Sequence, residues 1–307
     1  MTWVIDAPSG VYRNHALSGQ IRREAMYDVQ TLKFLSVEPG FGKRRGDTIT
    51  ITRFMQLPPA GRIGEQDALP QGRPAINTKS LQVGSWGYKV PVTEFEELLT
   101  HFDVTNYIQQ MLKDQMALTM DLMGKTAMAK TLYKYTPQVG GGVFSTTGTP
   151  AGTATANLAV SDLRLIRDQL RKNKAPFFRG NRYVGILSTR CARGIKNDPE
   201  YKDWQAPHTK EPLITGMIND DVEGFILLET NNIFSFADLV GASTVCGEAL
   251  FFGADPAFLG VIMQPELRAG IPMELGLFRE VGWVGHLDAS ITWDIASLSR
   301  VIHLTST

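Results

Sequence analysis

The clearest pattern of polar and apolar positions is a strict alternation over residues 47–54. Threonine occupies every second position there, and Ile49, Ile51 and Arg53 occupy the positions between. A period of two built from β-branched residues predicts a β-strand. Residues 81–92 predict a second strand, which two internal glycines weaken.

The segment between these two predicted strands has an unusual composition. It contains four prolines, three glycines and few large apolar side chains. A connection of this length without structure of its own is rare inside a compact domain, and an isolated two-stranded hairpin is only marginally stable in water. Either the strand assignments are wrong or the segment is a projecting arm that packs on another subunit. We favour the arm.

Apolar residues recur at helical spacing in three further segments. Ser18 is placed to cap a helix over residues 18–36, which the Pro-Gly pair at 39–40 ends. After a short acidic turn at 94–99, residues 104–135 contain no proline and predict a helix of roughly 45 to 50 Å. A third helix is predicted to begin at Ser161 or Asp162 and to end near Asn173.

The rest of the chain predicts a mixture of strands and loops, and therefore an α+β fold. Residues 137–157 form a loop rich in glycine, serine and threonine. The expected strands or short mixed elements cover 182–189, 224–229, 244–252, 258–263, 275–283 and 289–304.

Composition narrows the functional classes. The 31 basic residues balance the 31 acidic ones, which excludes a protein that holds nucleic acid mainly through an overall cationic surface. At 43% hydrophobic residues the chain is not disordered, and its two cysteines cannot form a disulfide framework. We expect no secretion signal and no membrane span, because the start has no basic region before an apolar run and apolar stretches stay too short.

Three local patterns resemble catalytic or metal-binding chemistry, and none is complete. Residues 124–126 (Gly-Lys-Thr) match the end of a phosphate-binding loop, but they lie in a predicted helix whose amides are already bonded. Cys191 has basic neighbours without a signature histidine, and His286 with Asp288 has no third ligand at a recognisable spacing. We therefore expect no catalytic residue, no cofactor and no metal.

Basic residues also cluster locally, at 22–23, at 43–45 and along the face of the predicted helix from Arg164 to Lys174. Such clusters usually form a solvated face, and local contact with a polyanion is the alternative.

The order of these parts is similar to a known family. The residues that carry the likeness are 38–53 (Glu-Pro-Gly-Phe-Gly-Lys-Arg-Arg-Gly-Asp-Thr-Ile-Thr-Ile-Thr-Arg), 90–95, the long helix, 183–190 and 198–204. Their sequence resembles the major capsid proteins of tailed double-stranded DNA bacteriophages with the Hong Kong 97 (HK97) fold. Within that family it looks most like the branch named after the coat protein of the N4 podophage.

The resemblance implies an α+β capsid subunit divided into five segments. These are an N-terminal arm (1–43), an extended β-hairpin loop or E-loop (44–92), a peripheral P-domain with a spine helix and the glycine-rich loop (93–159), a mainly axial A-domain (160–270), and strands that return to the P-domain (271–307). It also implies hexamers and pentamers that close into an icosahedral virion shell around packaged double-stranded DNA, without sequence-specific binding. Assembly would take place in the host bacterial cytoplasm, with a separate scaffold protein, a portal and possibly decoration proteins as further partners.

Seven residues of the expected arm are candidates for contacts between subunits. Arg44, Arg45 and Arg53 are candidates for ion pairs, and Ile49, Ile51, Trp86 and Tyr88 are candidates for packing. Two other functions remain open at this stage: another virion component, such as a tail or ring protein, and a cytosolic enzyme of unrecognised class.

Overall fold

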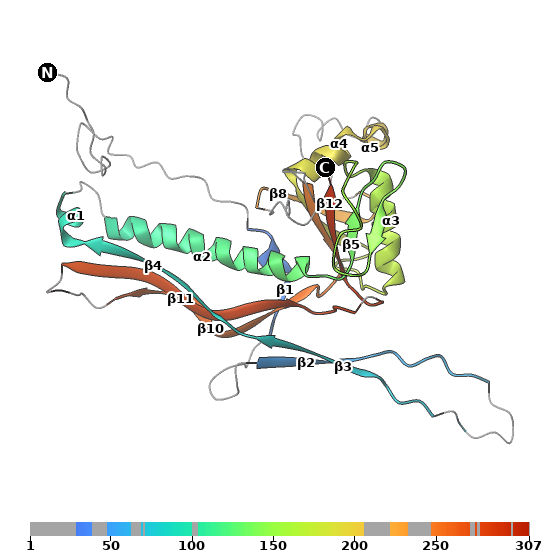
Figure 1. The fold of residues 1–307 in the computed structure, drawn as a ribbon, viewed down its shortest axis with the longest axis horizontal. Coiled ribbons are helices and arrows are strands. Elements are labelled where there is room, and N and C mark those ends of the chain that lie inside the picture. The colour runs from blue at the N-terminus through green and yellow to red at the C-terminus, as the bar shows by residue number, and fades with distance from the viewer. Residues whose placement is uncertain are drawn as a thin grey trace.

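The structure, a computed structural model, has an elongated half and a compact half (Figure 1). It describes residues 29–38, 48–62, 69, 71–99, 104–205, 222–232, 247–270, 274, 277–295 and 297–306. Several predictions lie outside these ranges, among them those for residues 18–28, Arg44 and Arg45. Within the described ranges no helix combines the length and the apolarity needed to cross a membrane.

The elongated half is a long helix lying along a four-stranded sheet. The strand order is β1 (Leu35–Glu38), β10 (Ala257–Ala269), β11 (Phe278–Ile291) and β4 (Ser85–Thr93). In this four-stranded sheet β1 and β10 run parallel, and the other neighbouring strands run antiparallel. Helix α2 (Val104–Ala129) covers one face, where Leu112 packs against Val281 and Trp283, and the short helix α1 (Glu94–Leu99) lies at the far end (Figure 1).

The compact half is built on a six-stranded sheet. Its strand order is β6 (Val143–Ser145), β5 (Lys134–Thr136), β12 (Val301–Ser306), β9 (Gly247–Phe252), β7 (Tyr183–Ser188) and β8 (Phe225–Thr230). The accompanying helices are α3 (Val160–Lys172), α4 (Thr189–Asn197) and α5 (Pro199–Gln205). Strands β7, β9 and β12 bury nearly every residue, as expected for central strands covered on both faces.

The predicted strand over 47–54 is confirmed, but its partner differs from the expected one. Strand β2 (Thr48–Phe54) pairs antiparallel with β3 (Ile76–Gln82), so the hairpin closes earlier in the chain than 81–92. The stretch 81–92 is instead shared between the end of β3 and β4, with Gly84 between them. Strand β4 leaves the hairpin and joins the four-stranded sheet.

Two helix predictions need correction. The end of the helix predicted over 18–36 is wrong: the chain forms a short 3-10 helix η1 (Thr31–Phe34) and then β1 (Leu35–Glu38), because β1 gains a parallel partner in β10. The long helix ends at Ala129 and is about 39 Å long. The residues after it, rich in β-branched and aromatic side chains, form β5 beside β12.

The Gly-Lys-Thr string at 124–126 has a packing role. A methyl group on Gly124 would lie 2.9 Å from Leu35 Cδ1 and 3.2 Å from Thr31 Cγ2, so glycine lets the N-terminal segment lie close to α2. The Thr31 amide also donates to Asp121 Oδ1 over 2.7 Å. The string therefore lies inside a helix and seats the N-terminal segment, and its helical amides cannot cradle a phosphate.

Candidate functional site

The β2–β3 hairpin has an inner face that packs on its own chain. Ile49 and Leu81, opposite each other in the pairing register, both approach Gly260 of β10. A methyl group on Gly260 would lie 2.5 Å from Ile49 Cδ1 and 3.2 Å from Leu81 Cδ2. Glycine at this position therefore lets the hairpin lie directly on the strand, since a methyl group there would force the Ile49 side chain to shift.

The same inner face carries a charged contact further along the hairpin. Arg53 Nη1 donates to Asp294 Oδ1 over 2.8 Å, and Lys79 Nζ donates to Asp294 Oδ2 over 2.7 Å. The Arg53 guanidinium also lies 5.6 Å from the centre of the Trp293 ring, and Arg300 lies 4.9 Å from it on the same ring. One carboxylate thus joins both strands of the hairpin to the segment that follows β11.

These contacts also set the protonation of Asp294. Burial by itself raises the pKa of this carboxyl, but the hydrogen bonds and positive charges of Lys79 and Arg53 outweigh burial and hold the pKa below its usual value. Asp294 is therefore ionised at neutral pH and binds both cations. We call Ile49, Leu81, Gly260, Arg53, Lys79 and Asp294 the hairpin anchor.

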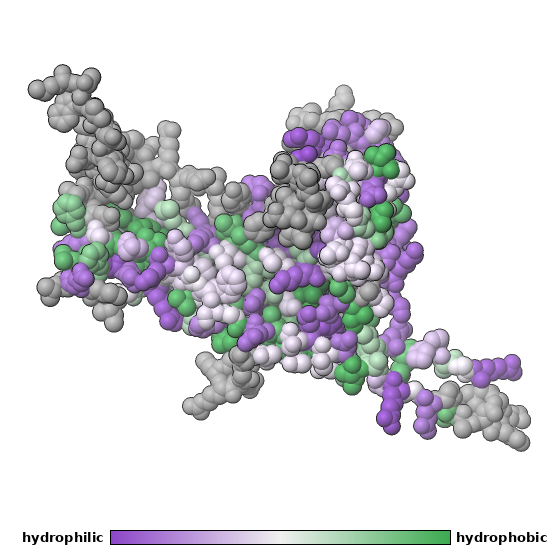
Figure 2. All heavy atoms as spheres, viewed as in Figure 1, coloured by the Kyte–Doolittle hydropathy of each residue, from purple (hydrophilic) through white to green (hydrophobic). Residues whose placement is uncertain are grey.

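The outer face of the hairpin is different, because it leaves apolar side chains exposed. Phe54 and Ile76 are paired across the two strands, and they are 67% and 59% exposed. Beyond them, Leu57 and Leu69 in the connection are 50% and 74% exposed. This part of the chain projects away from the body (Figures 1 and 2). Four large apolar groups gathered on one projection mark a contact surface.

A second apolar surface lies at the opposite end of the elongated half. Phe95 and Leu98 on α1 are 71% and 77% exposed, and Leu277 and Phe278 at the start of β11 are 53% and 40% exposed. The backbone hydrogen bond from Glu94 N to Leu277 O, 3.0 Å long, holds these two segments together. The two exposed apolar surfaces therefore lie on segments at opposite ends of the ribbon in Figure 1.

The structure separates the seven interface residues predicted from the sequence. Ile49 and Ile51 lie on the inner face of the hairpin. Trp86 and Tyr88 are not on the hairpin but on β4, the edge strand of the four-stranded sheet, where they are 40% and 54% exposed.

The side chain of Arg53 is only 2% exposed and forms an ion pair with Asp294 of the same chain. Its predicted ion pair between subunits stays a prediction. Arg44 and Arg45 lie outside the described residues.

Sequence reasoning missed Lys79, Gly260 and Asp294. Lys79 was available from the pattern, because it shares the inner-face positions of β3 with Leu81. Asp294 gave no such signal, because it is separated from Arg53 by 241 positions and no local pattern links them.

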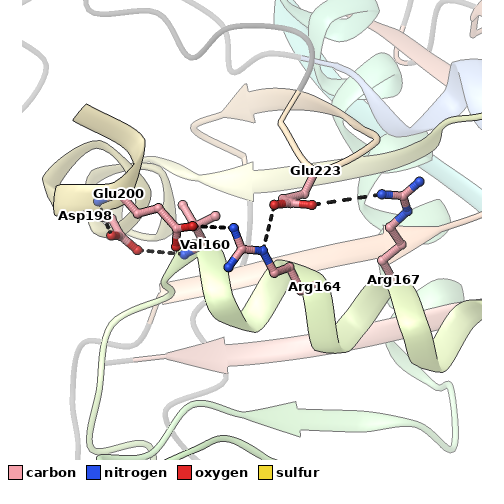
Figure 3. Close-up of polar contacts among 6 residues, drawn as sticks. All are labelled: Val160, Arg164, Arg167, Asp198, Glu200 and Glu223. Atoms are coloured by element: carbon pink, nitrogen blue, oxygen red, sulfur yellow. Dashed lines mark hydrogen bonds and ion pairs between the residues drawn. The ribbon is translucent and has the colours of Figure 1, made fainter. Parts of the chain in front are cut away.

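Two basic residues of the α3 face, Arg164 and Arg167, pair with acidic neighbours (Figure 3). Arg164 Nε donates to Glu223 Oε1 over 2.7 Å, and its Nη2 also donates to Glu200 Oε1. Arg167 lies 4.0 Å from Glu223. Asp198 accepts the amide of Val160 over 2.8 Å and so stabilises the start of α3. These contacts hold α3, α5 and the turn before β8 together, and they favour a structural role for Arg164 and Arg167 over polyanion contact.

The remaining candidates for chemistry do not form a site. Cys191 is buried, and burial raises the pKa of its thiol to about 11, so it carries little thiolate at neutral pH. Among the described residues, His, Cys, Asp and Glu side chains do not assemble into a group of three that could hold a metal ion.

Comparison with solved structures identifies the fold. The chain resembles one in the capsid asymmetric unit of cyanophage Pam1 with a TM-score of 0.75 and 15% identity, over 96% of each chain. A chain of the head of Helicobacter pylori bacteriophage KHP40 matches with a TM-score of 0.69 and 14% identity, over 99% of this chain and 97% of that one. A chain of the mature capsid of bacteriophage PhiM1 matches with a TM-score of 0.66 and 10% identity, over 100% and 97%.

Comparisons of the sequence itself do not assign the chain to a family. No family model matches the chain, and no curated protein matches it. The α+β fold of HK97 type that the sequence led us to expect is confirmed by the structural likenesses. The narrower resemblance to the N4 coat protein stays a prediction.

Proposed function

We propose that this chain is the major capsid protein of a tailed double-stranded DNA bacteriophage, and that its copies assemble as hexamers and pentamers into a closed icosahedral shell. The fold shared with chains of phage capsids over nearly the whole length supports this proposal. On this view the chain works through contacts between copies and not through catalysis, and it resides in the virion after assembly in the host cytoplasm.

One observation carries the mechanism. The hairpin is fixed to its own subunit by its inner face, yet Phe54, Ile76 and Leu57 on its outer part are 67%, 59% and 50% exposed. A rigid base with an exposed apolar end is suited to reach a neighbouring subunit, because burying apolar surface contributes about 25 cal/mol per Å². Many such contacts, repeated around a closed symmetric shell, are stable although each is weak.

The segment roles follow as part of the proposal. We assign the projecting hairpin within 44–92 to contact with the adjacent subunit, α2 to the spine of the peripheral domain, and the six-stranded sheet to the axial domain. The segment limits at 43, 92, 159 and 270 stay predictions. The limit at 270 falls between β10 and β11, which are neighbours in the four-stranded sheet, whereas β12 belongs to the six-stranded sheet. Trp86 and Tyr88 remain candidates for intersubunit packing from the edge strand β4.

The partners beyond other copies are also proposals. A separate scaffold, a portal and possibly decoration proteins would complete the particle, and the shell would enclose double-stranded DNA without reading its sequence. The equal numbers of basic and acidic residues suit a wall that does not hold phosphate strongly.

Deleting residues 56–74 and closing the hairpin with a short Gly-Ser turn tests this proposal. We expect a folded chain, shown by an unchanged circular dichroism spectrum, that forms no closed particles in electron micrographs. Gly61→Ala and Gly72→Ala alter the same loop without removing a large apolar side chain and serve as controls that assemble normally. Shells of normal size from the deletion variant would show that the projection does not drive assembly.

A further inference from the structure

Five ionisable side chains are buried together where the end of α2 meets the six-stranded sheet. They are Asp121, Lys125, Lys134, Glu248 and His303, and each is at most 4% exposed. We call them the joint cluster. Burying charged groups away from water costs folding free energy unless the charges are paired or neutralised. We therefore ask what a cluster of this size in the core of a subunit does.

On the sheet side, the cluster crosses three adjacent strands. Lys134 Nζ of β5 donates to His303 Nδ1 of β12 over 3.2 Å, and also to the carbonyl of Ala129 at the end of α2. With Nδ1 accepting, the neutral ring carries its proton on Nε2 and donates to Glu248 Oε1 of β9 over 2.6 Å. A single row of contacts therefore connects Glu248, through His303, to the last turn of the long helix.

On the helix side, Asp121 ties together three parts of the chain. Its Oδ1 accepts the amide of Thr31 in η1, its Oδ2 accepts from Asn232 Nδ2 over 2.8 Å, and Lys125 Nζ lies 3.3 Å from the same oxygen. The cluster thus holds the N-terminal segment, the long helix and the compact half at one point.

The remaining ionisable neighbours come from α4. Cys191 lies near enough for the charge of Glu248 to affect its thiol, and Arg190 acts on the same thiol with the opposite sign.

The second carboxyl oxygen of Glu248 indicates its protonation state. Oε2 is buried and has no hydrogen-bond partner among the described residues. A charged carboxylate in that position would leave an unsatisfied negative oxygen, whereas a protonated acid carries no net charge there. Burial accordingly raises the pKa of Glu248 to about 9, although the positive charges of Lys125 and Lys134 oppose the shift.

The pKa values of the neighbouring basic side chains are lowered, which favours their neutral forms as well. Burial lowers the pKa of Lys134 to about 8, against the attraction of Glu248. Burial also lowers the pKa of Lys125, and burial together with the charge of Lys134 lowers that of His303.

We propose that the joint cluster is a proton-operated lock between the long helix and the six-stranded sheet, closed while Glu248 holds its proton and loosened when that proton is lost. Opening of the joint exposes Glu248 to water, where a glutamate is ionised at neutral pH. Opening therefore releases a proton, and it becomes more favourable as the pH rises towards 9. The lock belongs to the single subunit and does not depend on the function proposed above.

The other members limit the pH range over which the effect is visible. Below about pH 6.5 an exposed histidine gains a proton on opening, which offsets the proton that Glu248 loses. Above about pH 8 the opened Lys134 gains a proton, with the same offsetting effect, and the opened Lys125, whose pKa burial also lowers, acts in the same direction. The net rise in the opening equilibrium is therefore concentrated between about pH 6.5 and 8, where we expect roughly a tenfold change.

Hydrogen exchange followed by mass spectrometry on the unassembled wild-type chain tests the lock. The relevant peptides cover the end of α2 and strand β12, and rates are corrected for the intrinsic pH dependence of amide exchange. We expect the corrected opening constant to rise roughly tenfold between about pH 6.5 and 8 in the wild type, and not to rise in Glu248→Gln, which keeps this position neutral. Glu266→Gln, at an exposed glutamate of β10, is the matched control and should behave like the wild type.

An equal rise in Glu248→Gln, or a wild type without any rise, would overturn the proposal. If the variant fails to fold, infrared spectroscopy of the wild type gives a direct answer. A protonated carboxylic acid band present at pH 7 and lost between about pH 8 and 10 supports the lock. The absence of that band at pH 7 rejects it.

Discussion

Arg53 of β2 and Asp294 after β11 form an ion pair inside one subunit, with 2.8 Å between Nη1 and Oδ1. The arginine side chain is 2% exposed and the aspartate side chain 30% exposed. Because Asp294 also binds Lys79 of the paired strand, a single carboxylate holds both strands of the hairpin base, in addition to the apolar contacts of Ile49 and Leu81 at Gly260. The rigidity of the projection therefore depends on this residue.

Asp294→Asn is expected to loosen the hairpin base at neutral pH. The variant keeps the size of the side chain but removes the charge that both cations bind, which should cost about 1–2 kcal/mol of unfolding free energy. Denaturant unfolding measures the global loss, and hydrogen exchange of the peptide 48–54 measures the local one.

Measuring hydrogen exchange of Asp294→Asn at several pH values tests whether the charge of Asp294 is responsible for the loss. Since the pKa of Asp294 is held below its usual value, its contribution is complete at neutral pH and is lost only as the pH falls through that lowered pKa. The ratio of the hydrogen-exchange rates of peptide 48–54 in the variant and in the wild type should stay constant from pH 7 to about pH 5. It should approach one below about pH 4. A ratio that reaches one already at about pH 6 would mean that the charge of Asp294 does not hold the hairpin.

Gly260→Ala is expected to lift the hairpin from β10. The added methyl group would lie 2.5 Å from Ile49 Cδ1, well inside contact distance, and overpacking of this kind typically costs about 1–3 kcal/mol. Gly61→Ala is the control, because a methyl group there would have nothing within 4 Å. Equal unfolding midpoints for the two variants would show that the hairpin does not rest on Gly260.

Local patterns in the sequence predicted the local parts of this fold. The alternation of threonine and isoleucine around Ile49 gave β2, and the proline-free apolar repeat gave most of α2. The prediction extended α2 too far because Leu132 continues the helical spacing, whereas the β-branched and aromatic residues around it favour the strand that β12 completes.

The hairpin anchor was harder to predict from the sequence, because it is formed by contacts between segments that are far apart in the chain. Arg53 shares the inner-face positions of Ile49 and Ile51, so its burial was foreseeable from the alternation alone. Its partner Asp294 was not, because the turn that brings it to the hairpin is set by the long pairing of β10 with β11. The strand β3 was missed because two of its inner positions are polar, which hides the apolar period.

Electron microscopy of the purified wild-type chain and of the double variant Phe54→Ser/Ile76→Ser tests the central claim most directly. The two substitutions remove the exposed apolar pair at the outer end of the hairpin and leave the anchor in place. We predict closed icosahedral particles from the wild type, with its scaffold where assembly requires one, and folded unassembled chains from the variant. Tubes, rings or only small oligomers from the wild type, or shells of normal size from the variant, would contradict the account.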